Sequence, residues 1–206
     1  VKLQLPEELT DDAYGSFLST ALWRCNYRYA IDNVMDPMHG AYLHAKSHSM
    51  STGDKSAQMR LSETGQGWMF EKENQRGVNF DWVEFADTGT FWMRLAIPYR
   101  KNAGPGGNFT IIGFVTPVTE QVCQVYFWRV RKVSGWERDT WRFLYKNRLE
   151  GLHWDVLEQD RVVLEAMQDN ARTRESLYQH DAGMTKIRRD LRILAQKQVN
   201  TQTSHA

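Results

Sequence analysis

The chain has 206 residues, of which 41% are hydrophobic, 12% aromatic and 25% charged, the composition of a folded domain rather than of a disordered chain. A formal net charge of +1 gives no broad basic surface for nucleic acid or an acidic membrane, so neither is an expected partner. Apolar runs such as residues 111–115 are too short to span a bilayer. Cys25 and Cys123 supply no disulfide framework, although one bridge stays open, and they favour a reducing, cytoplasmic compartment.

The first expected element is a helix. Residues 5–12 combine a proline with several acidic side chains, as expected where a helix begins, and the pattern continues through Trp23. Residues 1–20 are therefore expected to form a linker and this first helix. From residue 58 to residue 136, runs rich in aromatic and β-branched residues between turn signals predict about five to eight strands. The clearest runs are residues 67–70, 80–84, 90–99, 109–115 and 121–130.

After Trp136 the pattern returns to helix. Apolar residues recur at near-helical spacing over residues 141–156 and again over residues 163–184, and residues 196–206 are expected to form a tail. The order of helix, antiparallel strands and helices predicts one α+β domain over residues 1–206, in which helices cover one face of a curved sheet.

The residues that indicate chemistry are Asp36, His39 and His44. His39 follows Asp36 by three positions, so on a helix the two share a face, and Asp36 is placed to accept the second ring N–H of His39. His44 lies roughly 140° further round an ideal helix, so both imidazoles reach one ion only if the helix bends, which Gly40 permits. Two His and one carboxylate with open positions is the arrangement of non-haem Fe(II) oxygenases. The motif alone is short, and most histidines bind no metal.

The flanking residues make the motif more specific. The segment 30–44, which begins Ala-Ile-Asp-Asn-Val-Met-Asp-Pro-Met-His and ends Leu-His, closely resembles the mononuclear iron motif of Rieske oxygenase α subunits. The resemblance is to the vanillate and dicamba demethylase-like and phthalate dioxygenase-like branch, in which Asn-x2-Asp-x2-His-x4-His recurs. It implies that His39 and His44 bind Fe(II). It also implies that Asp36 carries electrons from a Rieske centre to His39, and that Asn33 lies close to the iron.

Two further stretches match the same branch. Residues 157–167 resemble its C-terminal helix, whose Asp completes the ligand set, so Asp160 is the implied third ligand and Asp155 the rival carboxylate. Residues 116–128 are similar to its central sheet. The resemblance spans roughly residues 20–175 and implies a helix-grip fold, in agreement with the order of elements above.

The chain departs from a full α subunit in having no Rieske ligands. Neither Cys25 nor Cys123 has a His two or three residues further on, so this chain by itself holds no [2Fe–2S] cluster. The Rieske module is expected either on a longer parent protein, which the Val start favours, or on a separate polypeptide. The family's head-to-tail homotrimer brings in the cluster of a neighbouring subunit, and a reductase or ferredoxin supplies the electrons.

The implied activity is O2-dependent hydroxylation, dihydroxylation or oxidative demethylation of an aromatic substrate at the mononuclear Fe(II) site. Alignment with the demethylating branch places Val34, Trp92, Gly113 and Gly151 near the substrate. Both glycines stand where dicamba-type enzymes have larger residues, which favours a roomier pocket, although simple packing explains them equally well. His153, in charged helical surroundings, is expected to be solvated.

Two alternatives of other classes remain. A zinc-dependent hydrolase uses the same three ligands, and a non-catalytic helix-grip ligand-binding domain keeps the shape without the metal.

Overall fold

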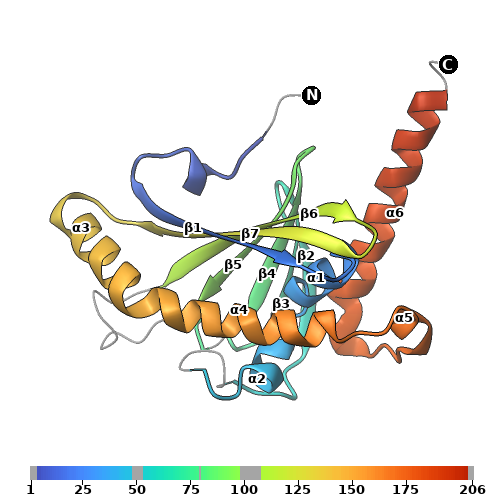
Figure 1. The fold of residues 1–206 in the computed structure, drawn as a ribbon, viewed down its shortest axis with the longest axis horizontal. Coiled ribbons are helices and arrows are strands. Elements are labelled where there is room, and N and C mark those ends of the chain that lie inside the picture. The colour runs from blue at the N-terminus through green and yellow to red at the C-terminus, as the bar shows by residue number, and fades with distance from the viewer. Residues whose placement is uncertain (1–3, 48–52, 79, 98–107, 204–206) are drawn as a thin grey trace.

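The structure is a computed structural model that describes residues 4–47, 53–78, 80–97 and 108–203. Seven antiparallel strands form one sheet in the order β1-β7-β6-β5-β4-β3-β2 (Figure 1). Because every neighbouring pair except β1 and β7 is consecutive in sequence, the sheet is a meander whose first strand returns to pair with its last. The strands are β1 (Tyr14–Trp23), β2 (Met59–Glu63), β3 (Gly67–Lys72), β4 (Trp82–Asp87), β5 (Phe91–Ile97), β6 (Phe109–Thr119) and β7 (Val122–Lys132).

Helices follow the first strand and the last. The predicted α+β architecture, with helices on one face of an antiparallel sheet, is confirmed. Among the described residues no helix is both long and apolar enough to cross a membrane. The helical segments are η1 (Glu7–Leu9), α1 (Tyr27–Val34), α2 (His39–Leu43), α3 (Gly135–Leu144), the π-helical η3 (Tyr145–Leu149), α4 (Glu150–Glu165), α5 (Ala171–Arg174), η4 (Gln179–Asp181) and α6 (Ala182–Thr203).

The prediction of a helix that runs through Trp23 is wrong, because residues 14–23 form β1, the strand at one edge of the sheet. Ser19 and Trp23 are buried, whereas Leu18 and Leu22 are exposed, so burial follows a period of two along much of the strand. All ten residues of β1 pair with β7. Only the short 3-10 turn η1 lies where the helix was expected to begin.

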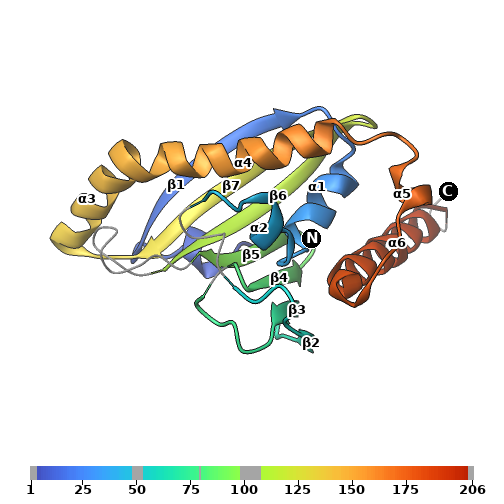
Figure 2. The ribbon, with the colours of Figure 1, turned by 90° about the horizontal axis from the view of Figure 1, so that it is seen from below.

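The main core lies between the sheet and the helices α1, α4 and α6. Figure 2 shows α4 and α1 on the same side of the sheet. Trp23, Phe70 and Phe85 of the sheet pack there with Ile31 of α1 and Ile187 of α6. Burying each such side chain contributes about 1.5–3 kcal/mol, so this layer accounts for much of the stability. A tail was expected at residues 196–206. That prediction is wrong for residues 196–203, because α6 continues to Thr203.

A buried ion pair fastens α6 to α1. The guanidinium of Arg188 donates to both carboxylate oxygens of Asp32, with Nη2–Oδ2 at 2.7 Å and Nε–Oδ1 at 3.0 Å. Asp32 is buried, and burial raises the pKa of its carboxyl although Arg188 opposes this shift. Since α1 leads directly into residues 35–44, this pair also steadies the segment that carries the two histidines of the site.

We expect Arg188→Met to lower the free energy of unfolding by about 3 kcal/mol at pH 8, because Asp32 then stays buried without its counter-charge. A carboxyl whose folded pKa is raised is destabilising when ionised, and this penalty disappears as pH falls through the folded pKa. The loss should therefore shrink towards pH 4. Urea unfolding at both pH values measures it, with Arg189→Met, at a 68% exposed side chain, as the control. Equal losses in the two variants would contradict the assignment.

Candidate metal centre

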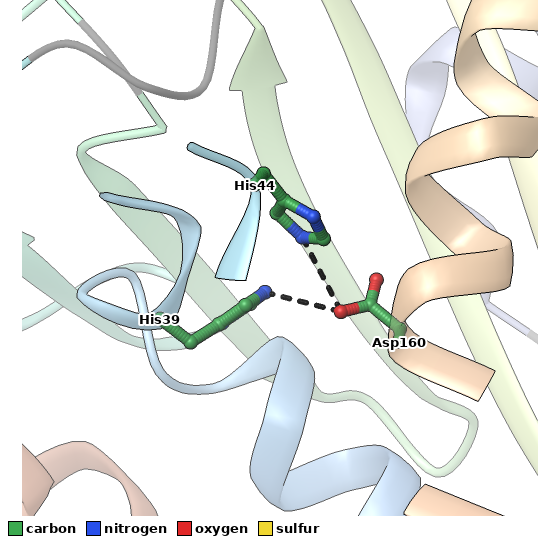
Figure 3. Close-up of side chains that lie close together, drawn as sticks. All are labelled: His39, His44 and Asp160. Carbon is green, nitrogen blue, oxygen red and sulfur yellow. Dashed lines mark ion pairs between the residues drawn. The ribbon is translucent and has the colours of Figure 1, made fainter. Parts of the chain in front are cut away.

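Two imidazoles and one carboxylate converge in the space between α2 and α4 (Figure 3). Nε2 of His39 lies 3.5 Å from Oδ1 of Asp160, and Nε2 of His44 lies 3.3 Å from the same oxygen. One donor atom from each of the three residues lies within 4.8 Å of the others. His44 and Asp160 are buried and His39 is partly buried. Residues more than 110 positions apart in sequence thus meet at one point, as a metal site requires.

The chain brings the two histidines together by ending a helix, not by bending one. The helix α2 begins at His39 and ends at Leu43, and His44 follows with φ −97° and ψ 33°, outside the helical region. Its side chain is therefore not held at the 140° offset that a continuous helix would impose. The expected bend at Gly40 is replaced by this early helix end.

Asp36 supports His39 in a different way from the one expected. The backbone carbonyl of Asp36 accepts a hydrogen bond from Nδ1 of His39 at 2.5 Å. The carboxylate instead accepts the backbone N–H of Met38 at 2.8 Å. The prediction that the Asp36 carboxylate accepts the second ring N–H is therefore wrong, because the turn into α2 uses it to cap the backbone. Since a carbonyl can only accept, Nδ1 of His39 carries the hydrogen and Nε2 keeps its lone pair.

His44 is oriented by the residue beside Asp160. Oε1 of Gln159 accepts from Nδ1 of His44 at 3.1 Å, which again leaves Nε2 facing the carboxylate. Burial acts to lower the pKa of His44, but Asp160 and Gln159 outweigh it, so the pKa is raised. The position thus favours a positive charge, whether a proton or a cation.

The three side chains fit a metal ion. Nε2 of His44 and Oδ1 of Asp160 are buried, and the described residues give neither atom a hydrogen-bond partner. Leaving buried polar atoms in that state is unfavourable. Two ligands about 2.1 Å from one ion and at a right angle lie about 3 Å apart, close to the two separations from Asp160. Two imidazoles and a carboxylate suit iron or zinc.

The rival carboxylate is excluded by its place on α4. Asp155 is exposed, whereas Asp160 faces the sheet and is buried. Five residues separate them, which turns the two side chains to different sides of the helix.

An apolar cavity adjoins the three side chains. The structure places Asn33 and Val34, the last two residues of α1, in its wall. The sheet contributes Leu95, Ile97, Phe109, Ile111, Phe127 and Arg129, and the remaining wall consists of Phe80 with His153, Val156 and Leu157 of α4. Such a cavity, with few polar groups, is typical of a small-molecule site.

The other three residues expected near the substrate do not line this cavity. Trp92 alternates with the cavity-facing residues of β5, so it lies on the opposite face of the sheet, packed with Ile112. Gly113 is covered by Phe127, since a Cβ added to it would meet that ring at 3.4 Å. Gly151 is exposed on α4, with no atom within 4 Å of an added Cβ. These placements correct the pocket inferred from alignment.

Sequence reasoning missed two polar residues of the wall. His153 was expected to be solvated, but it is only 8% exposed, and its Nδ1 lies 3.2 Å from the hydroxyl of Tyr145. Its position seven residues before Asp160, two turns along one helix face, was the available signal. Arg129 follows Phe127 by two positions on β7, so alternation gives the two side chains the same face.

A larger hollow lies away from this centre. It has a volume of about 620 Å³ between α1 and α6 and contains none of the three converging side chains. Its wall includes four arginines, which are Arg28, Arg172, Arg188 and Arg192. The three candidate metal ligands therefore line the smaller, more apolar cavity and not this hollow.

Comparisons with known proteins agree with this fold. The dicamba monooxygenase structure bound to dicamba matches with a TM-score of 0.63 and 17% identity over 96% of this chain and 63% of that one. The terminal oxygenase of carbazole 1,9a-dioxygenase from Nocardioides aromaticivorans IC177 gives 0.63, with 17% identity over 88% and 58%. NdmB of Pseudomonas putida CBB5 gives 0.67, with 15% identity over 90% and 52%. The chain thus spans between about half and two thirds of these structures.

No curated protein sequence matches the chain at a significant level. The family model of the vanillate O-demethylase oxygenase C-terminal domain matches residues 23–197, most of its length. The chain therefore belongs to this family, whose members are the catalytic domains of Rieske non-haem iron oxygenases.

Proposed function

We propose that the chain is the oxygen-activating domain of an enzyme that hydroxylates, dihydroxylates or oxidatively demethylates an aromatic substrate. The observation that carries the proposal is the meeting of His39, His44 and Asp160 at the wall of an apolar cavity. A ferrous ion at that point, fed with electrons by a Rieske [2Fe–2S] centre, supplies the activation of O2. The reaction runs in the cytoplasm, which the two free cysteines favour.

The residues of the chain prepare the site for such an ion. The carbonyl of Asp36 and the amide of Gln159 each hold a ring hydrogen on Nδ1, so both Nε2 atoms are available as ligands. An ion held by only these three protein ligands would still be able to bind O2 beside the substrate. Asn33 lies in the same wall, where its amide can hydrogen-bond near the reacting atoms.

The apolar wall binds and orients the aromatic ring. Phe109 and Phe127 offer ring surfaces, and Leu157 of α4 closes the opposite side. Filling this space with substrate would displace water from the neighbourhood of His39, His44 and Asp160.

The electrons come from outside the chain. We assign to Asp36 the link towards the Rieske centre, because its backbone carbonyl accepts a hydrogen bond from Nδ1 of His39. The cluster belongs either to the remainder of a longer protein or to a separate polypeptide, and a reductase or ferredoxin serves it. One solved relative is described as a complex of an oxygenase with ferredoxin. A homotrimer, in which a neighbouring subunit brings the cluster close, is part of this proposal.

A zinc hydrolase with the same ligands is the competing enzyme. To separate the two, the chain is purified without oxygen, its metal is measured, and it is combined with a Rieske module, a reductase, NADH and a methoxyarene. We expect iron at about one equivalent, O2 uptake, and product that gains oxygen from labelled O2 or loses its methyl group. Stoichiometric zinc with turnover that does not need O2 would overturn the oxygenase proposal.

A non-catalytic ligand carrier is the second alternative. It predicts that His39→Ala leaves ligand binding and every assay unchanged, whereas the oxygenase proposal predicts loss of O2 uptake and of product in the reconstituted system.

We expect Asp160→Asn to lower Fe(II) affinity by roughly a hundredfold or more, because the change removes the only charged ligand while keeping its size. Calorimetric titration with Fe(II) under argon measures it. Asp155→Asn, an exposed change on the same helix, is the matched control and should bind as the unaltered chain does. Wild-type affinity in Asp160→Asn would show that Asp160 is not a ligand.

Gln159→Leu should weaken Fe(II) binding by about 10- to 100-fold, because Nδ1 of His44 loses its acceptor and the ring is no longer fixed. The same titration reports the change, with Gln198→Leu on the exposed side of α6 as the control. An unchanged affinity would mean that packing alone orients His44.

A further inference from the structure

The two cysteines of the chain meet at one corner of the sheet. Sγ of Cys25 lies 4.0 Å from Sγ of Cys123, although the two residues are 98 positions apart in sequence. Cys123 is on β7, where its register partner is Trp23, the last residue of β1, and Cys25 follows Trp23 by two positions. Figure 1 and Figure 2 show the end of β1, the start of α1 and the β6–β7 turn together at this corner. The fold therefore brings two thiols from distant parts of the chain into contact.

The distance between the two sulfur atoms can be closed by a small movement. A disulfide bond is about 2.05 Å long, so the atoms must approach each other by about 2 Å. Cys25 lies in the bend between β1 and α1, outside the ladder that ends at Trp23 and outside the helix that begins at Tyr27. Cys123 is paired with β1 on one side and with β6 on the other. We therefore expect Cys25 to move and Cys123 to stay in place.

The contact makes the two thiols chemically different. The S–H of Cys123 donates to the sulfur of Cys25 and lowers the pKa of the Cys25 thiol, although burial and the nearby Glu165 oppose this shift. The same hydrogen bond raises the pKa of Cys123, and burial adds to that effect. Since the thiolate is the nucleophilic form of a cysteine, Cys25 is the thiol that attacks and Cys123 is the one that keeps its proton.

The two thiols also differ in their access to solvent. Cys25 is 6% exposed and lines a hollow of about 390 Å³, whereas Cys123 is completely buried. Basic and acidic side chains share the wall of this hollow, namely Arg24, Arg28, Arg172, Glu120 and Asp169. A small neutral oxidant such as hydrogen peroxide can therefore reach Cys25 from this side, while Cys123 is reached only through Cys25.

We propose that Cys25 and Cys123 form a reversible disulfide site that hydrogen peroxide oxidises. The Cys25 thiolate attacks one peroxide oxygen, the O–O bond breaks, and Cys25 becomes a sulfenic acid while the hydroxide that leaves takes up a proton and becomes water. The sulfur of Cys123 then attacks the sulfenic sulfur, the S–O bond breaks, and the OH group leaves with the proton of Cys123 as a second water. Two thiols and one peroxide thus give one disulfide and two waters, and a small thiol reverses the change by exchange.

The bond would fasten the start of α1 to β7. Asn26, next to Cys25, caps α1 and donates to the carbonyl of Glu120 at 2.8 Å. The backbone N–H of Arg24 donates to Glu165 at the end of α4, also at 2.8 Å. A disulfide adds a covalent link to this corner and closes a loop that contains both histidines of the metal centre, so it restricts the unfolded chain. The site needs neither a metal nor O2 activation, so it is independent of the proposed function.

The test treats the full chain with hydrogen peroxide, after EDTA has removed any metal so that no iron reacts with the oxidant. We expect the free thiols, counted in urea, to fall from two per chain to none, and the mass to fall by two hydrogens, about 2 Da. Dithiothreitol should restore both thiols. The melting temperature of the oxidised chain should be higher by roughly 5 °C or more.

Three results of this experiment would overturn the proposal. The first is the survival of both thiols in excess peroxide. The second is a disulfide that joins only different chains, which peptide mapping around Cys25 and Cys123 detects. The third is a lower melting temperature after oxidation, since it would mean that the bond strains the fold.

Single variants assign the role of each thiol. In Cys123→Ser we expect Cys25 to form a sulfenic acid that dimedone traps, with no disulfide inside the chain. In Cys25→Ser the buried Cys123 should keep its thiol at least about tenfold longer than Cys25 does in Cys123→Ser. Neither variant should gain in melting temperature. Faster oxidation of Cys123 than of Cys25 would contradict the assigned roles. If Cys123→Ser does not fold by circular dichroism, Cys123→Ala, which places no hydroxyl in the core, replaces it.

Discussion

The buried meeting of His44 with Asp160 is the constraint on which the rest of this structure depends. Two atoms that both carry lone pairs, Nε2 and Oδ1, face each other at 3.3 Å with no hydrogen-bond partner among the described residues. A proton on His44 relieves the conflict in part, which is why its pKa is raised. A divalent cation relieves it for His39 as well, because all three donors then share one charge. The fold thus holds lone-pair atoms close together without a positive charge between them, and a metal ion supplies that charge.

Keeping these ligand atoms close together requires that the helices that carry them are held firmly in place. The side chain of Asn26 caps α1 and also donates to the carbonyl of Glu120 at 2.8 Å, which fastens the start of the helix to the β6–β7 turn. Asp32 and Arg188 fasten its last turns to α6. Since α2 follows α1 within a few residues, these contacts also limit the movement of both histidines. Asp160 and Gln159 arrive together on α4, so one helix supplies a ligand and the support of another ligand.

Much of the site could be predicted from sequence because it is local or resembles a known motif. The resemblance of residues 30–44 and 157–167 to the motifs of a known family nominated all three residues, and the structure brings them together. Their geometry was not predictable, since it depends on where α2 ends. The support of His39 was assigned to the wrong part of Asp36, because a pattern of residue types does not tell a carboxylate from a carbonyl of the same residue.

The errors in the fold have a common physical origin. Residues 14–23 were expected to be helical, yet they form β1, because pairing with β7 and burial of Trp23 outweigh local signals. His153 was expected in solvent for a related reason. Charged residues such as Glu150 and Asp155 lie nearby in sequence, but on other sides of α4, and only the sheet opposite shows which side of the helix is covered. Trp92 was expected near the substrate, yet the alternation along β5 places it on the face of the sheet that points away from the cavity.

The same alternation makes the register of the sheet a determinant of what the cavity can bind. On β7 the side chains of Phe127 and Arg129 face the cavity, while Trp128 and Val130 pack on the other face. A slip by one residue would replace a cation with an indole or an isopropyl group at the same point of the wall. The irregularity between β6 and β7 lies at Pro117 and Thr119, near the turn, and the ladder is regular from there to the pair of Thr110 with Val130. The side chain of Arg129 and the metal centre are therefore held at a fixed separation, by the sheet on one side of the cavity and by α4 on the other.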